Sequence, residues 1–248
     1  MSYTVAAFYQ FVPLQQLSDR QACFQDLCQQ ENLIGTILLA EEGINATVAG
    51  TEKGIEHLIR SLHADPCFHE MVVKYSVCEE PPFRRMKVLI KKEIVTFGVE
   101  DLHPDQMTGI QVSPDEWNAL LQQDDVIVID TRNTYEIEQG TFKGAIDPKT
   151  EKFTDFIDYV KTKLNPDQHK KIAMCCTGGI RCEKASAYLL RQGFEQIYQL
   201  EGGILRYLED VDPDKSLWEG QCFIFDARET VRSESLGKPH SKNTPCVS

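Results

Sequence analysis

The chain has 248 residues, of which 42% are hydrophobic, and it carries a formal net charge of −12. This length suits two domains that each bury a core. No apolar run approaches the roughly 20 residues that cross a bilayer, and no basic region precedes the first apolar stretch, so we expect a cytoplasmic protein. The acidic balance argues against a general polyanion binder, because such a surface repels phosphate groups at long range.

The first 98 residues are predicted to form one small domain of order β-α-β-β-α-β. Strands are expected at residues 4–11, 35–40, 46–50, 71–77 and 87–98. Ser18 and Gln21 have the spacing of a capping box, which predicts a helix to Gln30, and Thr51 is expected to cap a second helix over 52–63. This order predicts a ferredoxin-like domain, an open sheet with its helices on one face.

Residues 99–112 are polar and rich in turn-forming residues, so they are predicted to be a linker. A second domain is expected over residues 113–226, beginning with a helix capped by Ser113 and ending with an added strand. Within it, apolar strands alternate with amphipathic helices, which indicates an α/β domain with a parallel sheet. Residues 227–248, rich in Ser, Lys and Pro, are predicted to be a disordered tail.

The stretch "CTGGIRC" lies between a predicted buried strand and a predicted helix. Unpaired N–H groups at a helix N-terminus and the positive end of its dipole stabilise an anion, so a cysteine there becomes a nucleophilic thiolate. Gly178 and Gly179 permit close backbone approach, and Arg181 adds a fixed positive charge. Two spacings compete: Cys175 gives C-x5-R, the length in cysteine phosphatases, whereas Cys176 gives C-x4-R, a tighter ring suited to sulfur.

Nine cysteines could form disulfides or bind a metal, but their pattern argues against both. Their number is odd, no two form a CxxC pair, and the six histidines are scattered. We therefore expect reduced thiols and no metal site. The glycines of the thiol stretch also lack G-x-G-x-x-G spacing, and no other pattern indicates a bound flavin, nicotinamide or iron cofactor.

Two motifs resemble rhodanese domains. "DTRNTYEIEQGTFKGAI", residues 130–146, is similar to the pattern D-x-R-x-x-x-E-x-x-x-G-x-[FI]-x-G-A, and "LEGGI", residues 200–204, is similar to the closing signature L-x-G-G-[IW]. The resemblance implies that Cys176 is the nucleophile. The active-site loop that it implies also contains Thr177, Gly178, Gly179, Ile180, Arg181 and Cys182. Sulfurtransferases of this type usually have Ser or Thr at the position of Cys182.

A narrower resemblance is carried by "EEGIN", "FRRMKVLIKKEIVTFG", "CTGGIRCEKAS" and "LEGGILRYLED" in this order. From about residue 3 to 226 the chain resembles the tRNA uridine 5-hydroxylases that act at the wobble position, although it lacks the Cys-rich C-terminal extension of longer members. The resemblance implies dioxygen-dependent formation of 5-hydroxyuridine on tRNA, with an unidentified reductant. Glu42 and Asn45 either form a hairpin turn or support the site, and Arg132 either supports it or pairs with Glu136 or a neighbour.

Three chemical readings stay open for Cys176. Its thiolate could add to carbon 6 of uridine and so activate carbon 5, with Arg181 stabilising charge. Alternatively, the sulfur of Cys176 could carry a sulfenic acid or a persulfide. Cys182 could then resolve this species, or it could take no part. The persulfide reading predicts a rhodanese-type sulfurtransferase as the second candidate function, and a binding module without catalysis is the third.

Five cations follow one another in "FRRMKVLIKK" with no acidic residue among them: Arg84, Arg85, Lys87, Lys91 and Lys92. Alone, such a cluster indicates the solvated face of an edge strand. A tRNA substrate, however, requires phosphate contacts, and in an acidic protein these must be concentrated. With tRNA as the partner, the cluster is predicted to be the RNA-contacting surface of the first domain.

Overall fold

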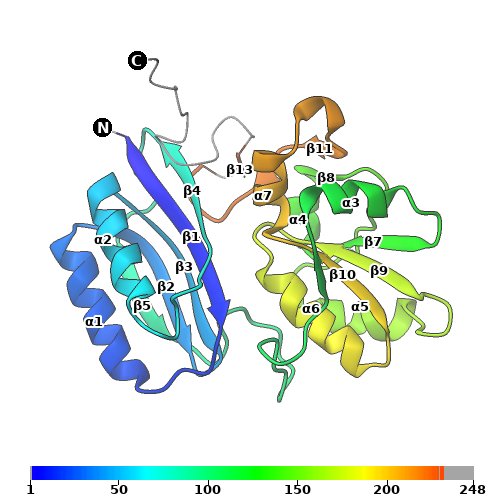
Figure 1. The fold of residues 1–248 in the computed structure, drawn as a ribbon, viewed down its shortest axis with the longest axis horizontal. Helices are drawn as coiled ribbons and strands as arrows, with labels where there is room; N and C mark the ends of the chain where they lie inside the picture. The colour runs from blue at the N-terminus through cyan, green and yellow to red at the C-terminus, as the bar shows by residue number, and fades with distance from the viewer. Residues whose placement is uncertain (1, 229, 232–248) are drawn as a thin grey trace, which may run out of the picture. The chain divides into compact units, whose positions relative to one another are not determined.

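The computed structural model describes residues 2–228 and 230–231, which fold into two compact units (Figure 1). The first unit extends to Ile94 and includes Asp226–Arg228, and the second contains Val95–Phe225 and the short strand at Thr230–Val231. No helix in these described ranges is long and apolar enough to cross a membrane.

The first unit is an open five-stranded sheet with two helices. Its elements are β1 (Tyr3–Phe11), α1 (Leu17–Gln30), β2 (Ile34–Ala40), β3 (Gly43–Gly50), α2 (Glu52–His63), β4 (Val73–Cys78) and β5 (Met86–Ile90). The strand order is β4-β1-β3-β2-β5, with β1 antiparallel to β3 and β4, and β2 parallel to β5. The predicted ferredoxin-like β-α-β-β-α-β domain is confirmed, and β5 extends its sheet by one strand.

Both helices of the first unit cover the same face of the sheet (Figure 1). The buried core draws alternate residues of the strands, such as Phe8 and Ile37, together with Leu58 of α2. Thr51 caps α2 as predicted, because its hydroxyl accepts a hydrogen bond from the Gly54 N–H at 3.2 Å. The predicted Ser18 cap is wrong, since α1 begins at Leu17, two residues earlier than that cap implies, after a left-handed Gln16.

The second unit is built on a parallel four-stranded sheet. Its elements are β6 (Ile110–Val112), α3 (Pro114–Leu121), β7 (Val126–Asp130), α4 (Thr134–Ile137), β8 (Gly140–Phe142), η1 (Phe153–Asp155), α5 (Phe156–Lys163), β9 (Lys171–Cys175), α6 (Ile180–Arg191), β10 (Gln196–Leu200), α7 (Gly203–Asp210), η2 (Pro213–Lys215), β11 (Trp218–Gly220), β12 (Cys222–Phe223) and β13 (Thr230–Val231). The sheet order is β6-β10-β9-β7, and every pair is parallel. The predicted α/β domain with a parallel sheet is confirmed.

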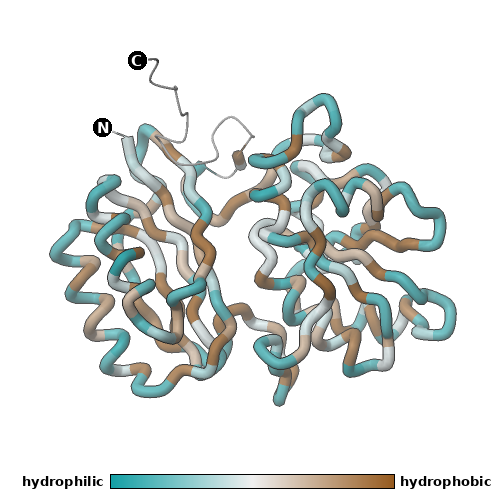
Figure 2. The backbone as a smooth tube through the Cα atoms, in the orientation of Figure 1, coloured by the Kyte–Doolittle hydropathy of each residue, from teal (hydrophilic) through white to brown (hydrophobic). Residues whose placement is uncertain are grey.

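Helices cover both faces of this sheet (Figure 1). Apolar side chains of α5 and α6, among them Phe156 and Leu189, pack on one face with Ile172. On the other face, Trp117 of α3 and Tyr207 of α7 pack around Phe142. Figure 2 shows the strands as hydrophobic and the solvent-facing loops as hydrophilic, as burial on both faces requires.

The segment predicted as a linker, residues 99–112, folds onto the second unit instead. Leu102 is buried, and Ile110–Val112 forms β6, which pairs with β10. Just before it, the ring of Phe97 packs 4.6 Å from that of Phe153. The prediction failed because few, irregularly spaced apolar side chains are enough to bury a segment whose composition is otherwise polar.

The end of the described chain also differs from the prediction. The single strand expected before residue 227 is two short ones: β11, which pairs with β8, and β12, which pairs with β13 in the segment predicted to be a disordered tail. Arg228, expected in a disordered tail, forms an ion pair with Asp226 and donates to the Ser76 hydroxyl at 2.8 Å within the first unit. The rest of the predicted tail, residues 229 and 232–248, lies outside the described residues.

Candidate active site

The thiol loop begins where β9 ends. Cys176 follows that strand, and the loop closes at Gly179, whose φ of 106° permits the turn into α6. The N–H of Gly179 donates to Sγ of Cys176 at 3.1 Å. The backbone N–H and the thiol of Cys182, in the first turn of α6, also donate to this sulfur. The start of the helix therefore surrounds Cys176 with hydrogen-bond donors.

These donors decide the ionisation of Cys176. Burial raises the pKa of its thiol, but the hydrogen bonds from Cys182 and Gly179 and the charge of Arg181 outweigh that effect and lower the pKa to about 5. In Cys175, by contrast, burial and the nearby Asp130 hold the pKa well above its ordinary value. The thiolate therefore lies on Cys176, which favours the C-x4-R spacing.

The pKa of Cys182 moves in the opposite direction. Burial and the neighbouring Cys176 thiolate raise it well above its ordinary value, so Cys182 keeps its proton. Its sulfur lies 3.7 Å from the hydroxyl of Thr131. A protonated Cys182 is the donor that a Cys176 thiolate requires.

The motif "LEGGI" holds the loop from the other side. The N–H groups of Ile204 and Leu205, at the start of α7, donate to the carbonyls of Cys176 and Thr177 at 3.0 Å each. Gly203 has a φ of +68°, and a Cβ there would lie 2.5 Å from the Cys176 carbonyl oxygen and 2.7 Å from the Gly179 nitrogen. Only glycine allows α7 to approach the loop this closely.

Arg181 directs its terminal nitrogens to a carboxylate. Nη1 and Nη2 donate to Oε1 and Oε2 of Glu136 at 2.6 Å and 2.8 Å, and both side chains are buried. Nη2 also lies 3.4 Å from the hydroxyl of Thr177. This ion pair orders the loop, and the guanidinium acts on Cys176 through its charge.

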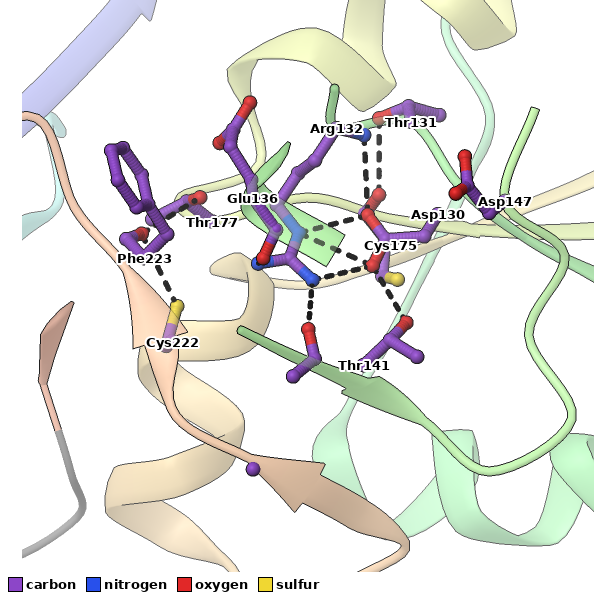
Figure 3. Close-up of polar contacts among 12 residues, drawn as sticks. Asp130, Thr131, Arg132, Glu136, Thr141, Asp147, Cys175, Thr177, Cys222 and Phe223 are labelled. Carbon is purple, nitrogen blue, oxygen red and sulfur yellow. Dashed lines mark hydrogen bonds and ion pairs between the residues drawn. The ribbon is translucent and has the colours of Figure 1, made fainter. Parts of the chain in front are cut away.

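Arg132 belongs to a separate ion pair (Figure 3). Its Nε and Nη2 donate to the carboxylate of Asp130 at 2.9 Å and 2.6 Å, and Nη2 also reaches the Gly140 carbonyl at 2.6 Å. Thr141 donates to the same carboxylate at 2.8 Å. Arg132 is fully buried. Of the two roles considered for it, these contacts favour the ion pair, with Asp130 as partner because Arg181 occupies Glu136.

The segment after β11 also contacts the loop. The hydroxyl of Thr177 lies 3.5 Å from the carbonyl of Phe223 (Figure 3), and the ring of Phe225 lies 5.7 Å from Cζ of Arg181. Cys222 is buried, and its pKa is raised to about 12, mainly by that burial. A buried thiol with this pKa is inert.

Glu42 and Asn45 lie in the first unit and contact its backbone. The carboxylate of Glu42 accepts from the Ile94 N–H at 2.6 Å, and the Asn45 amide donates to the Ile94 carbonyl at 2.9 Å. These two side chains therefore fix the segment that follows β5. Their contacts favour the turn and scaffold role over a direct role in chemistry.

The five predicted cations surround β5, an edge strand of the first unit. The strand is shorter than predicted, so only Lys87 lies within it; Arg84 and Arg85 precede it, and Lys91 and Lys92 follow. All five are exposed, and none forms an ion pair with another described residue. We call these five residues the basic cluster.

Sequence reasoning missed three contributors to the loop: Glu136 as the partner of Arg181, Gly203 as the packing glycine, and Phe225. Glu136 and Gly203 lie within the quoted motifs, so a signal was present, but spacing alone did not reveal what each contacts. Within residues 2–228 and 230–231, no group of three or more His, Cys, Asp or Glu side chains is placed to hold a metal ion.

Comparison with known proteins agrees with both units. Residues 3–94 match the UPF0176 acylphosphatase like domain, and residues 113–210 match the Rhodanese-like domain. A solved rhodanese-like domain from Anabaena sp. aligns with 44% of this chain and 78% of its own at 20% identity, with a TM-score of 0.37, a value too low to carry an argument.

Curated relatives cover nearly the whole chain. A protein of Synechocystis sp. is 51% identical over 94% of this chain and 84% of its own length. Relatives from Picosynechococcus sp. and Rhizobium leguminosarum are 48% and 51% identical, over 93% and 92% of this chain and 77% and 74% of their own lengths. All three are named tRNA uridine(34) hydroxylase. This chain therefore belongs to the tRNA uridine(34) hydroxylase family.

Proposed function

We propose that this protein hydroxylates carbon 5 of the uridine at position 34 of tRNA, with Cys176 as the nucleophile. The observation that carries the proposal is the low pKa of Cys176 in a loop built of helix N–H donors, within a chain about half identical to relatives named for this reaction. We also propose a cytoplasmic location, because the substrate would be tRNA.

The first step follows from the electronics of uracil. Carbon 6 is electrophilic because its double bond is conjugated with the carbonyl at carbon 4. The Cys176 thiolate donates an electron pair to carbon 6 and forms a C–S bond, while the electrons of the C5=C6 bond move to the carbonyl oxygen. The product is an enolate whose carbon 5 is electron-rich. A buried thiolate at neutral pH is the group that this step requires.

Oxidation then takes place at carbon 5. The enolate carbon attacks dioxygen, and two electrons with two protons convert the resulting hydroperoxide to a hydroxyl and water. Loss of the carbon 5 proton expels the Cys176 thiolate and restores the C5=C6 bond. The net reaction consumes one dioxygen, two electrons and two protons, and releases 5-hydroxyuridine and one water. An external two-electron donor supplies the electrons.

Access to the thiolate requires movement, because Cys176 has only 1% of its surface exposed. The segment around Phe223 lies against the loop through its contact with Thr177, at a long hydrogen-bond distance of 3.5 Å. We propose that this segment shifts when the uridine binds. A closed resting state would protect the thiolate from oxidation to a sulfenic acid.

A sulfurtransferase is the second candidate function, favoured by the match of residues 113–210 to the Rhodanese-like domain. In that reaction Cys176 would carry a persulfide. Incubation with thiosulfate followed by mass spectrometry discriminates the two: addition of one sulfur to Cys176 with rapid transfer to cyanide would favour the sulfurtransferase. The hydroxylase proposal predicts no rapid turnover.

The decisive experiment is nucleoside mass spectrometry of tRNA from a deletion strain that expresses the wild type, Cys176→Ala or Cys175→Ala. The two variants remove adjacent buried thiols, so Cys175→Ala is a matched control. We expect 5-hydroxyuridine with the wild type and the control but not with Cys176→Ala. Formation of 5-hydroxyuridine by Cys176→Ala would exclude the thiolate mechanism, and its absence with the wild type would exclude the function.

A further inference from the structure

Two exposed aromatic side chains lie together in the second unit. All phenylalanine, tyrosine and tryptophan residues of the chain fall within the described residues, and only Tyr135 and Phe225 are exposed, at 44% and 64%. Both rings contact that of Phe223, with centroid distances of 5.4 Å and 5.3 Å. The most exposed aromatic surface of the chain is therefore gathered around one residue.

This aromatic group adjoins the thiol loop. Phe225 lies 5.7 Å from Cζ of Arg181, whose charge lowers the pKa of Cys176. The carbonyl of Phe223 faces the Thr177 hydroxyl. Tyr135 directly precedes Glu136, which pairs with Arg181. The rings therefore lie beside residues that surround Cys176.

Burial does not account for the place of these rings. A phenylalanine with most of its surface in water gains little from the hydrophobic effect, and clustered exposed apolar groups mark binding surfaces. The charge of Arg181 is already balanced by Glu136, so it does not require the ring of Phe225. The exposed faces are thus available to a flat apolar partner.

We propose that Phe225 and Tyr135 form a stacking surface for an unpaired nucleobase in the tRNA loop that contains the target uridine. RNA loops are recognised through bases that stack on aromatic side chains, because every base has a π face. The rings offer little to a phosphate, which requires cations or N–H donors. This inference rests on the proposed function and assigns binding residues to it.

The test is the affinity of an anticodon stem–loop RNA, measured by fluorescence anisotropy, for four variants. Phe225→Leu keeps an apolar side chain without a ring, and Phe225→Tyr keeps the ring. Loss of one stacked base should weaken binding about tenfold or more for Phe225→Leu, whereas Phe225→Tyr should stay close to wild type. Tyr135→Ala should weaken binding in the same direction. Ile110→Ala, an exposed apolar position in β6, is the control expected to bind normally.

A double-mutant cycle identifies the base. RNAs with an abasic ribose at the target position or at either neighbouring position are prepared, and their affinities for the wild type and for Phe225→Leu are measured. The stacked base is the one whose removal abolishes the effect of the substitution on affinity. Equal affinity of Phe225→Leu and the wild type, or no coupling at any of these positions, would refute the stacking surface but not the proposed function. A wild type that binds no RNA would instead refute the proposed function.

Discussion

The guanidinium of Arg181 and the carboxylate of Glu136 form a buried ion pair with two parallel hydrogen bonds, 2.6 Å and 2.8 Å long. Glu136 belongs to α4, whereas Arg181 lies in the first turn of α6. The pair therefore ties the thiol loop to a second element of the fold and keeps the positive charge at a fixed place near Cys176.

Removing the charge of Glu136 should destabilise the second unit. Glu136→Gln leaves the buried guanidinium without a counter-charge, and breaking a buried pair in this way costs about 3–5 kcal/mol. Urea unfolding should show a decrease of that size in the free energy of unfolding. As a control, Asp210→Asn removes the exposed partner of Arg206 and should cost under about 1 kcal/mol. Equal effects of the two substitutions would contradict the assignment.

The pKa of Cys176 should depend on the donor at position 182. Hydrogen bonds to a thiolate favour the charged form, so their removal raises the pKa. In the wild type, the ultraviolet absorbance of the thiolate should appear as the pH rises through about 5. Cys182→Ala removes the donor and should move the midpoint upward, whereas Cys182→Ser keeps a donor and should stay near wild type. Cys176→Ser gives the background from other thiols.

A resolving role of Cys182 has a separate kinetic signature. If Cys182 reduces an oxidised Cys176, then Cys182→Ser should slow multiple turnovers more than a single turnover and accumulate a sulfenic acid that dimedone traps. The hydrogen bond from the Cys182 thiol to the Cys176 thiolate instead predicts that the single-turnover and multiple-turnover rates change by the same factor, since Cys182 then acts only on the ionisation of Cys176. The ratio of the two rates decides between these roles.

Substitution of two glycines that both have positive φ separates the effect of packing from the effect of backbone strain. Gly203→Ala and Gly193→Ala both place a side chain at positive φ, which costs about 1–2 kcal/mol. Only at Gly203 would the new Cβ clash with the loop; at Gly193, apart from its chain neighbours, no atom of the described residues lies within 4 Å of the new Cβ. We therefore expect both variants to lose stability but only Gly203→Ala to raise the pKa of Cys176 and lose activity. Normal activity in Gly203→Ala would show that α7 does not hold the loop.

The basic cluster should contribute to tRNA affinity through phosphate contacts. Arg84→Ala, Arg85→Ala and Lys87→Ala combined should weaken binding and flatten the slope of log affinity against log salt by about two, because each phosphate contact contributes roughly 0.7–0.9. The loss should be similar for different tRNAs. The alkylation rate of Cys176 should not change.

A charge-matched variant provides the control for that experiment. Lys161, Lys163 and Lys170 are exposed in the second unit, and their combined replacement by alanine changes the net charge equally. It should reduce the salt slope less than the cluster variant does. If the two triple variants bind tRNA alike, the basic cluster is only a solvated strand edge.

The order of elements followed from the sequence because it depends on local patterns. Alternating apolar residues in β1 and β3 and continuous apolar runs in β7 and β9 reflect burial on one or both faces of a sheet, which is visible in a few neighbouring residues. The caps at Thr51 and Ser113 act over three residues and were likewise predicted. The thiol loop was located for the same reason, since its glycines, arginine and cysteines are contiguous.

Tertiary structure decided which distant residues are partners. In the parallel sheet Asp130 lies opposite Cys175, so the segments that follow β7 and β9 meet at one edge of the sheet. At this edge Glu136 pairs with Arg181, 45 positions away, and Arg132 pairs with Asp130. Several acidic residues could satisfy either arginine by spacing alone. Which carboxylate each arginine pairs with depends on distances between side chains in three dimensions. The low pKa of Cys176 and the place of Phe225 beside Arg181 depend on the same distances. The reason is that electrostatic and packing energies vary with distance in space and not with separation along the chain.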